Sequence, residues 1–144
     1  MPALALDLDA VLADTRPLWD AWLDDAARRA RVELDVPEDR VAAAALLDER
    51  LGEWRPLLER FAADRAPVFF RPRADVSALL RRQAAAGARI GVYTDAPREL
   101  AELALAHVGA TRRVETVGTL DEVRAVLGAD VVVVASREEL AALP

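Results

Sequence analysis

The stretch ALALDLDAVLADT, residues 3–15, decides how the rest of the chain is interpreted. Its first part, residues 3–8, is a short apolar run, which is typical of a strand buried on both faces of a sheet. Asp7 and Asp9 then place two carboxylates where this strand ends. One carboxylate can act as a nucleophile while the other moves protons, and a divalent cation relieves their repulsion. The alternative is an Asx-turn leaving the strand, which we consider weaker because burying two aspartates there is costly.

Strand and helix patterns alternate along most of the chain. Separate strands are predicted at residues 90–93, 114–117 and 131–134. A helix that Asp75 can cap is expected before the first of them, and further helices begin at Pro97 and at the capping boxes of Thr119 and Ser136. This alternation predicts an α/β fold with a Rossmann-like parallel sheet. Residues 17–64 carry helical patterns only. We therefore expect an α/β core formed by residues 1–15 and 66–144, with a helical cap inserted at 16–65.

Ligands of open parallel sheets bind beyond the carboxyl ends of the strands. Besides Asp7 and Asp9, this rule selects Thr94 and Asp95 as candidate site residues. Asp95 has two open interpretations, because it can cap the following helix or line the site.

Composition limits the chemistry. At 144 residues the chain fits one domain, and its lack of cysteine and its single histidine exclude thiolate zinc sites and sites with several imidazoles. Any metal is then a hard cation held by oxygen. The net charge of −6 argues against a nucleic-acid partner. We expect a cytoplasmic protein, because the acidic N-terminus lacks the positive region of a signal peptide and no apolar run is long enough for a membrane span.

Two motifs resemble those of the haloacid dehalogenase (HAD) superfamily. DLDAVLADT, residues 7–15, resembles its first motif, and YTDAP, residues 93–97, resembles its second. The resemblance implies a magnesium-dependent phosphatase acting on a small phosphorylated metabolite. Asp7 would form an aspartyl-phosphate, Asp9 would protonate the leaving oxygen and activate water, and Thr94 would bind the phosphoryl group. Mg²⁺ would bind through Asp7 and the Asp9 carbonyl, and the second aspartate favours phosphoryl transfer over dehalogenation.

The chain departs from the family at the third and fourth motifs. The third normally supplies a lysine, but all 19 basic residues here are arginine. Arg112 or Arg113 could replace it, although a solvated turn is the interpretation we favour for this pair. The fourth motif normally supplies aspartates for Mg²⁺ and here reads Ala135-Ser136. Glu138 or Glu139 could reach the metal instead, although a capping box of Ser136 with Glu139 is the favoured interpretation.

These departures keep a second hypothesis open, that of a catalytically degenerate HAD-fold protein that binds a ligand without turnover. The remaining candidates have structural interpretations. We expect the tryptophans to form core, His107 to favour a helix C-terminus, Asp14 to cap the first helix of the cap, and Arg16, Arg71 and Arg73 to lie on solvated surface near the hinges.

Overall fold

The structure is a computed structural model that describes residues 2–144. Four parallel strands form one sheet in the order β3-β2-β1-β4, so β1 and β2 are central. The strands are β1 (Ala3–Asp7), β2 (Arg89–Tyr93), β3 (Thr116–Gly118) and β4 (Val132–Val134). The α/β fold with a parallel, Rossmann-like sheet is therefore confirmed.

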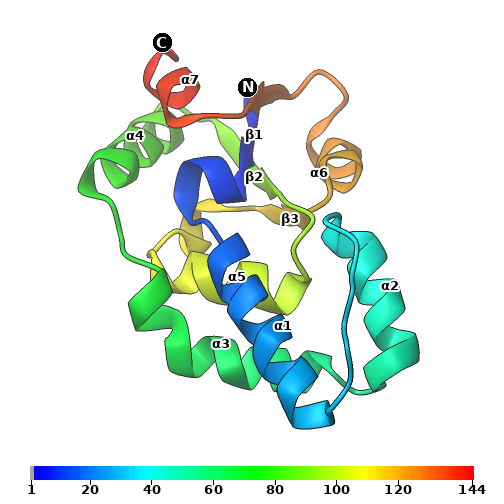
Figure 1. The fold of residues 1–144 in the computed structure, drawn as a ribbon. Coiled ribbons are helices and arrows are strands. Elements are labelled where there is room, and N and C mark those ends of the chain that lie inside the picture. The colour runs from blue at the N-terminus through cyan, green and yellow to red at the C-terminus, as the bar shows by residue number, and fades with distance from the viewer. Residues whose placement is uncertain (1) are drawn as a thin grey trace.

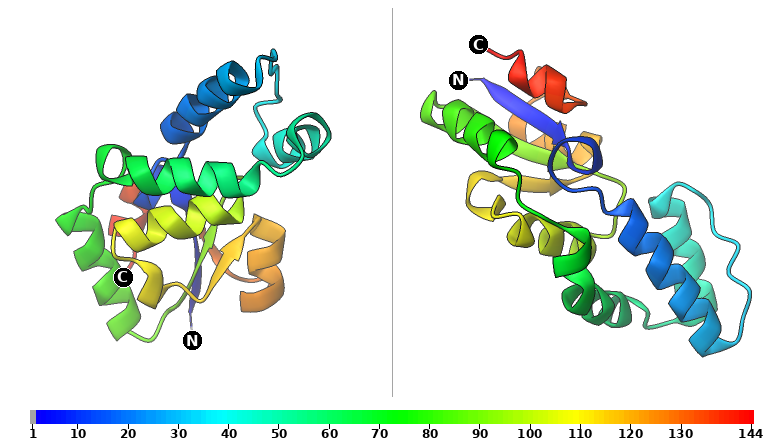
Figure 2. Two further views of the ribbon diagram at one scale, coloured as in Figure 1. Left: turned by 90° about the horizontal axis from the view of Figure 1, so that it is seen from below. Right: turned by 60° about the vertical axis from the view of Figure 1, so that its left-hand side comes forward.

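Helices cover both faces of this sheet, as Figures 1 and 2 show. They are α4 (Ala74–Ala85), α5 (Arg98–His107), α6 (Leu120–Leu127) and α7 (Arg137–Ala141). Leu4, Leu6, Ile90 and Val92 belong to the main hydrophobic cluster with residues of α4, α5 and α7. Ala5 on the opposite face packs with Val123 and Leu127 of α6.

In the sequence, a helical segment lies between β1 and the other strands. It contains α1 (Arg16–Ala30), α2 (Arg40–Leu51) and α3 (Arg55–Phe69). Figure 1 shows these helices gathered beyond the carboxyl ends of the strands. Because α3 packs against α5, the segment shares one hydrophobic cluster with the sheet. The expected boundary at residue 65 falls inside α3, which continues through Pro67 to Phe69.

Three indole rings form the centre of the helical segment. Trp19, Trp22 and Trp54 are buried, with ring centroids 5.5 Å to 6.2 Å apart. The Trp54 Nε1–H donates to Asp48 at 2.7 Å, so the one polar atom of this indole is satisfied. The prediction that the tryptophans form core is confirmed.

Several element boundaries differ from the predictions. The prediction that Asp75 caps a helix is wrong, because α4 begins at Ala74 and Asp75 lies in its first turn, paired with Arg73. β3 begins at Thr116, two residues later than predicted, because Thr111–Arg113 forms a 3-10 turn just before it. The capping box of Thr119 and Glu122 at the start of α6 is confirmed.

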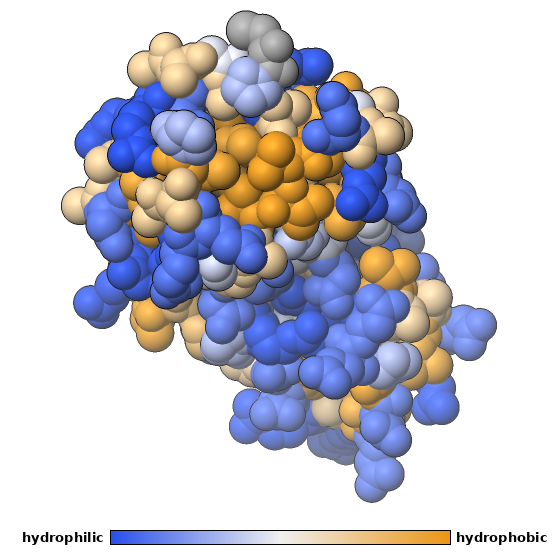
Figure 3. All heavy atoms as spheres, turned by 90° about the horizontal axis from the view of Figure 1, so that it is seen from above, coloured by the Kyte–Doolittle hydropathy of each residue, from blue (hydrophilic) through white to orange (hydrophobic). Residues whose placement is uncertain are grey.

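No helix among residues 2–144 has both the length and the apolar character that a bilayer span requires. Figure 3 views the molecule from the side on which Figure 1 draws β4 and α7, and an apolar area bordered by hydrophilic residues is visible there. β4 is an edge strand, and its Val132 and Val133 are exposed.

Candidate active site

The site begins where β1 ends. Asp7 is the last residue of the strand, and a π-helical turn at Leu8–Leu12 follows it. The Asp7 Oδ1 atom accepts the backbone N–H groups of Asp9 at 3.1 Å and Ala10 at 3.4 Å, which caps this turn. The second oxygen, Oδ2, accepts no hydrogen bond from residues 2–144. Asp7 therefore presents one free carboxylate oxygen beside an open cleft of about 630 Å³.

The surroundings of Asp7 disfavour its charge. Burial raises the pKa of the Asp7 carboxyl above its ordinary value, and the charges of Asp9 and Asp95 raise it further. The backbone N–H groups of Ala10 and Asp9 act in the opposite direction without cancelling the effect. Burial and the charges of Asp7 and Glu139 likewise raise the pKa of Tyr93, which is paired with Asp7 in the sheet.

Asp9, in contrast, is surrounded by donors. Its Oδ1 accepts the backbone N–H of Thr15 at 2.8 Å and the hydroxyl of the same residue. Its Oδ2 accepts the hydroxyl of Thr94 at 2.9 Å and the Nη2 of Arg40 at 2.8 Å. Thr94 stands directly after β2, so the two strand ends that were predicted to meet are joined by this hydrogen bond.

Arg40 is a site residue that sequence reasoning missed. It is the first residue of α2, and its side chain is only 1% exposed. Its Nη1 donates to the hydroxyl of Thr15 at 2.7 Å, and its Nε donates to the Oδ1 of Asp95 at 2.9 Å. With the bond to Asp9, the guanidinium binds both strand ends at once. The helical segment thus contributes a cation to the centre of the site.

Asp95 anchors the same helix. Its Oδ2 accepts the backbone N–H of Arg40 at 2.9 Å, while Asp39 accepts the next two N–H groups of α2. Burial would raise the pKa of Asp95, but hydrogen bonds and charge from Arg40, with Arg16 nearby, hold that pKa below its ordinary value. Of the two interpretations left open, Asp95 lines the site, and the helix it caps is α2, not the following α5.

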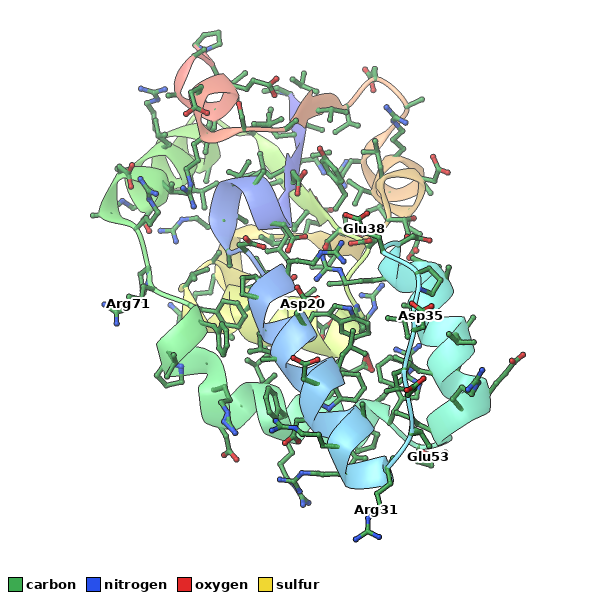
Figure 4. The ribbon with its side chains drawn as sticks, in the orientation of Figure 1. Asp20, Arg31, Asp35, Glu38, Glu53 and Arg71 are labelled. Carbon is green, nitrogen blue, oxygen red and sulfur yellow. The ribbon has the colours of Figure 1, made fainter. Side chains whose placement is uncertain are left out.

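Arg16 attaches the connection between α1 and α2 to Asp95. Arg16 donates from Nη1 to the carbonyl of Glu38 at 2.8 Å and lies 3.6 Å from Asp95. Figure 4 shows Glu38 where this connection reaches α2, on the side that faces the sheet, whereas Arg71 points outward. Arg16 therefore belongs to the border of the site, and the solvated interpretation of Arg71 is confirmed.

The remaining candidates lie elsewhere. Arg112 and Arg113 are in the 3-10 turn before β3, and neither lines the cleft. Glu139 is exposed, and its Oε2 accepts the backbone N–H of Ala135 at 2.6 Å. Ser136 accepts the backbone N–H of Glu139 at 3.1 Å and caps α7, but the predicted capping box is incomplete, because the Glu139 side chain accepts from Ala135 and not from Ser136. The structure brings together Asp7, Asp9, Thr94 and Asp95. The two arginines and Glu139 do not line the cleft, although the charge of Glu139 acts on Tyr93, which does.

The acidic groups near the cleft provide few ligands for a metal. No cluster of three or more Asp, Glu or His side chains suited to a metal ion occurs within residues 2–144. Asp7 offers one free carboxylate oxygen, whereas both oxygens of Asp9 are occupied. Mg²⁺ usually keeps several waters and binds through one or two carboxylates with substrate phosphate. The donor set thus fits an ion that arrives with a phosphate and does not fit a cage that holds one alone.

No protein-family model matches the chain, and no curated protein sequence matches it significantly.

Proposed function

We propose that this chain is a phosphoric monoester hydrolase with a HAD-like core, a helical cap at residues 16–65 and an aspartyl-phosphate intermediate on Asp7. The observation that carries the proposal is the free Oδ2 of Asp7, which lies beside an open cleft while Asp9, Thr94 and Arg40 are hydrogen-bonded next to it. A nucleophile, a proton-transfer group and a cation are the parts that phosphoryl transfer requires.

The reaction has two steps in this proposal. In the first, the Oδ2 of Asp7 attacks phosphorus and the bond to the leaving oxygen breaks, while Asp9 donates a proton to that oxygen. In the second, Asp9 removes a proton from water, which attacks the phosphoryl group and releases phosphate and the Asp7 carboxylate. Asp9 must be protonated for the first step, so its ion pair with Arg40 must open when the substrate enters.

Arg40 takes the role of the missing lysine in this account. Its guanidinium lies 2.8 Å from Asp9 and within 3.5 Å of the Thr94 hydroxyl, so in this proposal it gives up its contact to Asp9 when it binds the phosphoryl group. Arginine binds phosphate with a planar, forked donor set and stays charged at all working pH values. If Arg40 bound a phosphoryl oxygen in place of the Asp9 carboxylate, Asp9 would be free to take up a proton.

Magnesium would be held by the Asp7 carboxylate and the Asp9 carbonyl, with the substrate phosphate completing the ligand set. When bound, it would neutralise charge on the phosphoryl oxygens. The raised pKa of Asp7 supports this assignment, because a nearby cation would relieve the repulsion from Asp9 and Asp95.

One observation favours the second hypothesis, a HAD-fold protein that binds its ligand without turnover. Both oxygens of Asp9 already accept hydrogen bonds, and Arg40 already pairs with the carboxylates of Asp9 and Asp95. In a substrate complex, Arg40 would instead bind the substrate phosphate. A site that is this well satisfied without a ligand would bind phosphate weakly and would not release Asp9 for proton transfer.

Hydrolysis of an aryl phosphate with and without Mg²⁺ separates the two hypotheses. We expect metal-dependent turnover that Asp7→Asn abolishes. Arg40→Gln should lower kcat/KM by about a hundredfold, as removal of one charge-stabilising donor does elsewhere. Arg50→Gln, on the exposed end of the same helix, is the matched control and should have no effect. No turnover by a folded protein over a broad panel of phosphate esters would instead support the binding protein.

A further inference from the structure

A second cavity adjoins the cleft at Asp7. Its volume is about 330 Å³, and it lies between α2, the start of α5 and the connection from β3 to α6. Arg40, Thr94 and Asp95 line both spaces, so a molecule whose phosphate reaches Asp7 can extend its other end into this cavity.

The walls of this cavity combine apolar and charged side chains, and the acids Asp48 and Glu122 are among the charged ones. Val41 and Ala44 come from α2, Ala96 and Pro97 follow β2, and Val117 belongs to β3. Val41 is 52% exposed although it is an aliphatic residue beside a charged site. The apolar part of these walls provides contacts for a short hydrocarbon portion of a ligand.

Arg55 and Arg98 also line this cavity, and they are the cations available to a ligand. Arg55 stacks on the Trp54 ring at 4.5 Å and donates to Glu99 at 3.2 Å, so it is held in place with donors to spare. Arg98 is only loosely engaged, because its contacts to Glu102 and Glu122 are both 3.7 Å long. A ligand anion can displace these long contacts at little cost.

None of the residues from 2 to 144 that line the cavity is aromatic. A nucleobase would find no ring on which to stack, and stacking provides much of the binding energy for bases. A volume of about 330 Å³ is also at the low end for ligand pockets.

We infer that this cavity binds the leaving group of the substrate, and that this group is a short aliphatic acid whose carboxylate is bound by Arg98 with support from Arg55. The inference rests on the proposed phosphatase function, and it specifies the substrate class as phosphate esters of small hydroxy acids. Arg98 acts here as a specificity-determining residue, and because it does not line the cleft at Asp7, it takes no part in the chemical step.

The test compares two esters that differ in one group, the phosphate ester of 3-hydroxypropanoate and n-propyl phosphate. We expect kcat/KM to be about tenfold higher for the ester with the carboxylate, the value of one charge-assisted interaction. Arg98→Gln should remove this preference and leave n-propyl phosphate unchanged. Arg124→Gln, an exposed arginine on α6 that does not line the cavity, is the matched control. Equal kcat/KM for the two esters, or a preference that survives Arg98→Gln, would overturn the inference.

Calorimetric binding of the same esters to the Asp7→Asn protein separates this inference from the proposed activity. A preference for the carboxylate ester that depends on Arg98 would support the cavity assignment even if neither ester is hydrolysed, and only the activity would then be rejected. Equal or undetectable binding of the two esters would reject the cavity assignment whether or not an aryl phosphate is turned over.

Discussion

Asp7 and Asp95 are two carboxylates on neighbouring strand ends whose pKa values move in opposite directions. Burial and like charges raise the pKa of Asp7, whereas Arg40 outweighs burial at Asp95 and lowers its pKa. The difference arises because the guanidinium of Arg40 contacts Asp95 and Asp9 and makes no contact with Asp7. The unfavourable electrostatic interactions thus act on Asp7, the residue that we assign as the nucleophile.

Replacing that nucleophile should stabilise the protein. Because the pKa of Asp7 is raised in the fold, its ionisation disfavours the folded state at pH 7, and the penalty disappears below the ordinary pKa of 3.8. Asn keeps the oxygen that caps the turn. We expect Asp7→Asn to raise the free energy of unfolding by about 1 kcal/mol at pH 7, as substitutions at costly functional positions do. Urea denaturation at pH 7 and pH 3 measures this effect.

The gain should be absent at pH 3, and Asp20→Asn, at an exposed position on α1, serves as the control that should change little at either pH. Loss of stability in Asp7→Asn at pH 7 would contradict the electrostatic account of this residue.

Replacing Arg40 should have the opposite effect. Arg40→Leu leaves Asp9 and Asp95 without their shared cation, and breaking a buried ion pair in this way costs about 3 kcal/mol. The contribution of Asp95 is complete above its ordinary pKa of 3.8 and is lost as the pH falls through its lower folded pKa. Denaturation at pH 7 should therefore show the loss, and Arg50→Leu should not.

Adding Asp95→Asn to Arg40→Leu tests the same pairing from the other side. The double variant should be more stable than the sum of the single losses predicts, because the second change removes a carboxylate that no longer has a partner. Strict additivity would mean that Arg40 stabilises the fold through packing and not through Asp95.

Much of the site could be predicted from the sequence at this scale, but its central cation could not. Asp7, Asp9 and Thr94 each follow a recognisable strand, so the topology alone brings them together. Arg40 is one of 19 arginines and sits 31 residues from Asp9, in a segment without strands. The lack of lysine left Arg112 or Arg113 as possible replacements, and proposing Arg40 in their place required the position of α2.

At the element scale, the predicted boundaries agree with the structure where the signal is local in the sequence. Thr119 and Glu122 form a capping box whose two hydrogen bonds are local, and this helix start was predicted correctly. The cap expected at Asp75 was wrong because aspartate is favourable both as a cap and within the first turn, and the helix already begins at Ala74. The predicted start of β3 was wrong because Val114 fits a strand as well as Val117 does. The sequence pattern does not reveal the 3-10 turn at Thr111–Arg113 that comes just before the strand.

Gly91 in β2 allows α6 to approach the sheet closely. A Cβ at this position would lie 2.8 Å from the Val123 Cγ1 and 2.9 Å from the Leu127 Cδ1. We expect Gly91→Ala to lower the free energy of unfolding by about 2 kcal/mol through overpacking. Thermal denaturation provides the measurement.

Val123→Ala removes one of the clashing methyl groups, so combining it with Gly91→Ala should cost less than the two single changes together. If Gly91→Ala alone is as stable as the parent protein, the close packing of α6 on β2 is not as described.

At the scale of the whole molecule, the helical segment and the sheet share a core. Phe70 and Leu58 belong to the same hydrophobic cluster as Leu4 and Leu100, and the Arg40 contacts add a polar attachment. The segment was expected to be an inserted cap, and nothing in its sequence pattern indicated how closely α3 would pack against α5. That packing depends on side chains far apart in the chain, which periodicity does not reveal.

The shared core predicts a single unfolding transition. All three tryptophans lie in the helical segment, so their fluorescence reports that part, whereas far-UV circular dichroism reports the whole chain. The two signals should change at the same urea concentration, with one m value. A fluorescence transition at lower urea would show instead that the helical segment unfolds independently.

Trapping the aspartyl-phosphate intermediate tests most directly whether Asp7 accepts the phosphoryl group. The protein is mixed with Mg²⁺ and an aryl phosphate, quenched in acid within milliseconds, digested and analysed by mass spectrometry. We predict phosphate on the peptide that contains Asp7, less of it when Arg40→Gln is treated in the same way, and none with Asp7→Asn. Turnover without a phosphorylated peptide, or with the phosphate attached to another residue, would contradict the account.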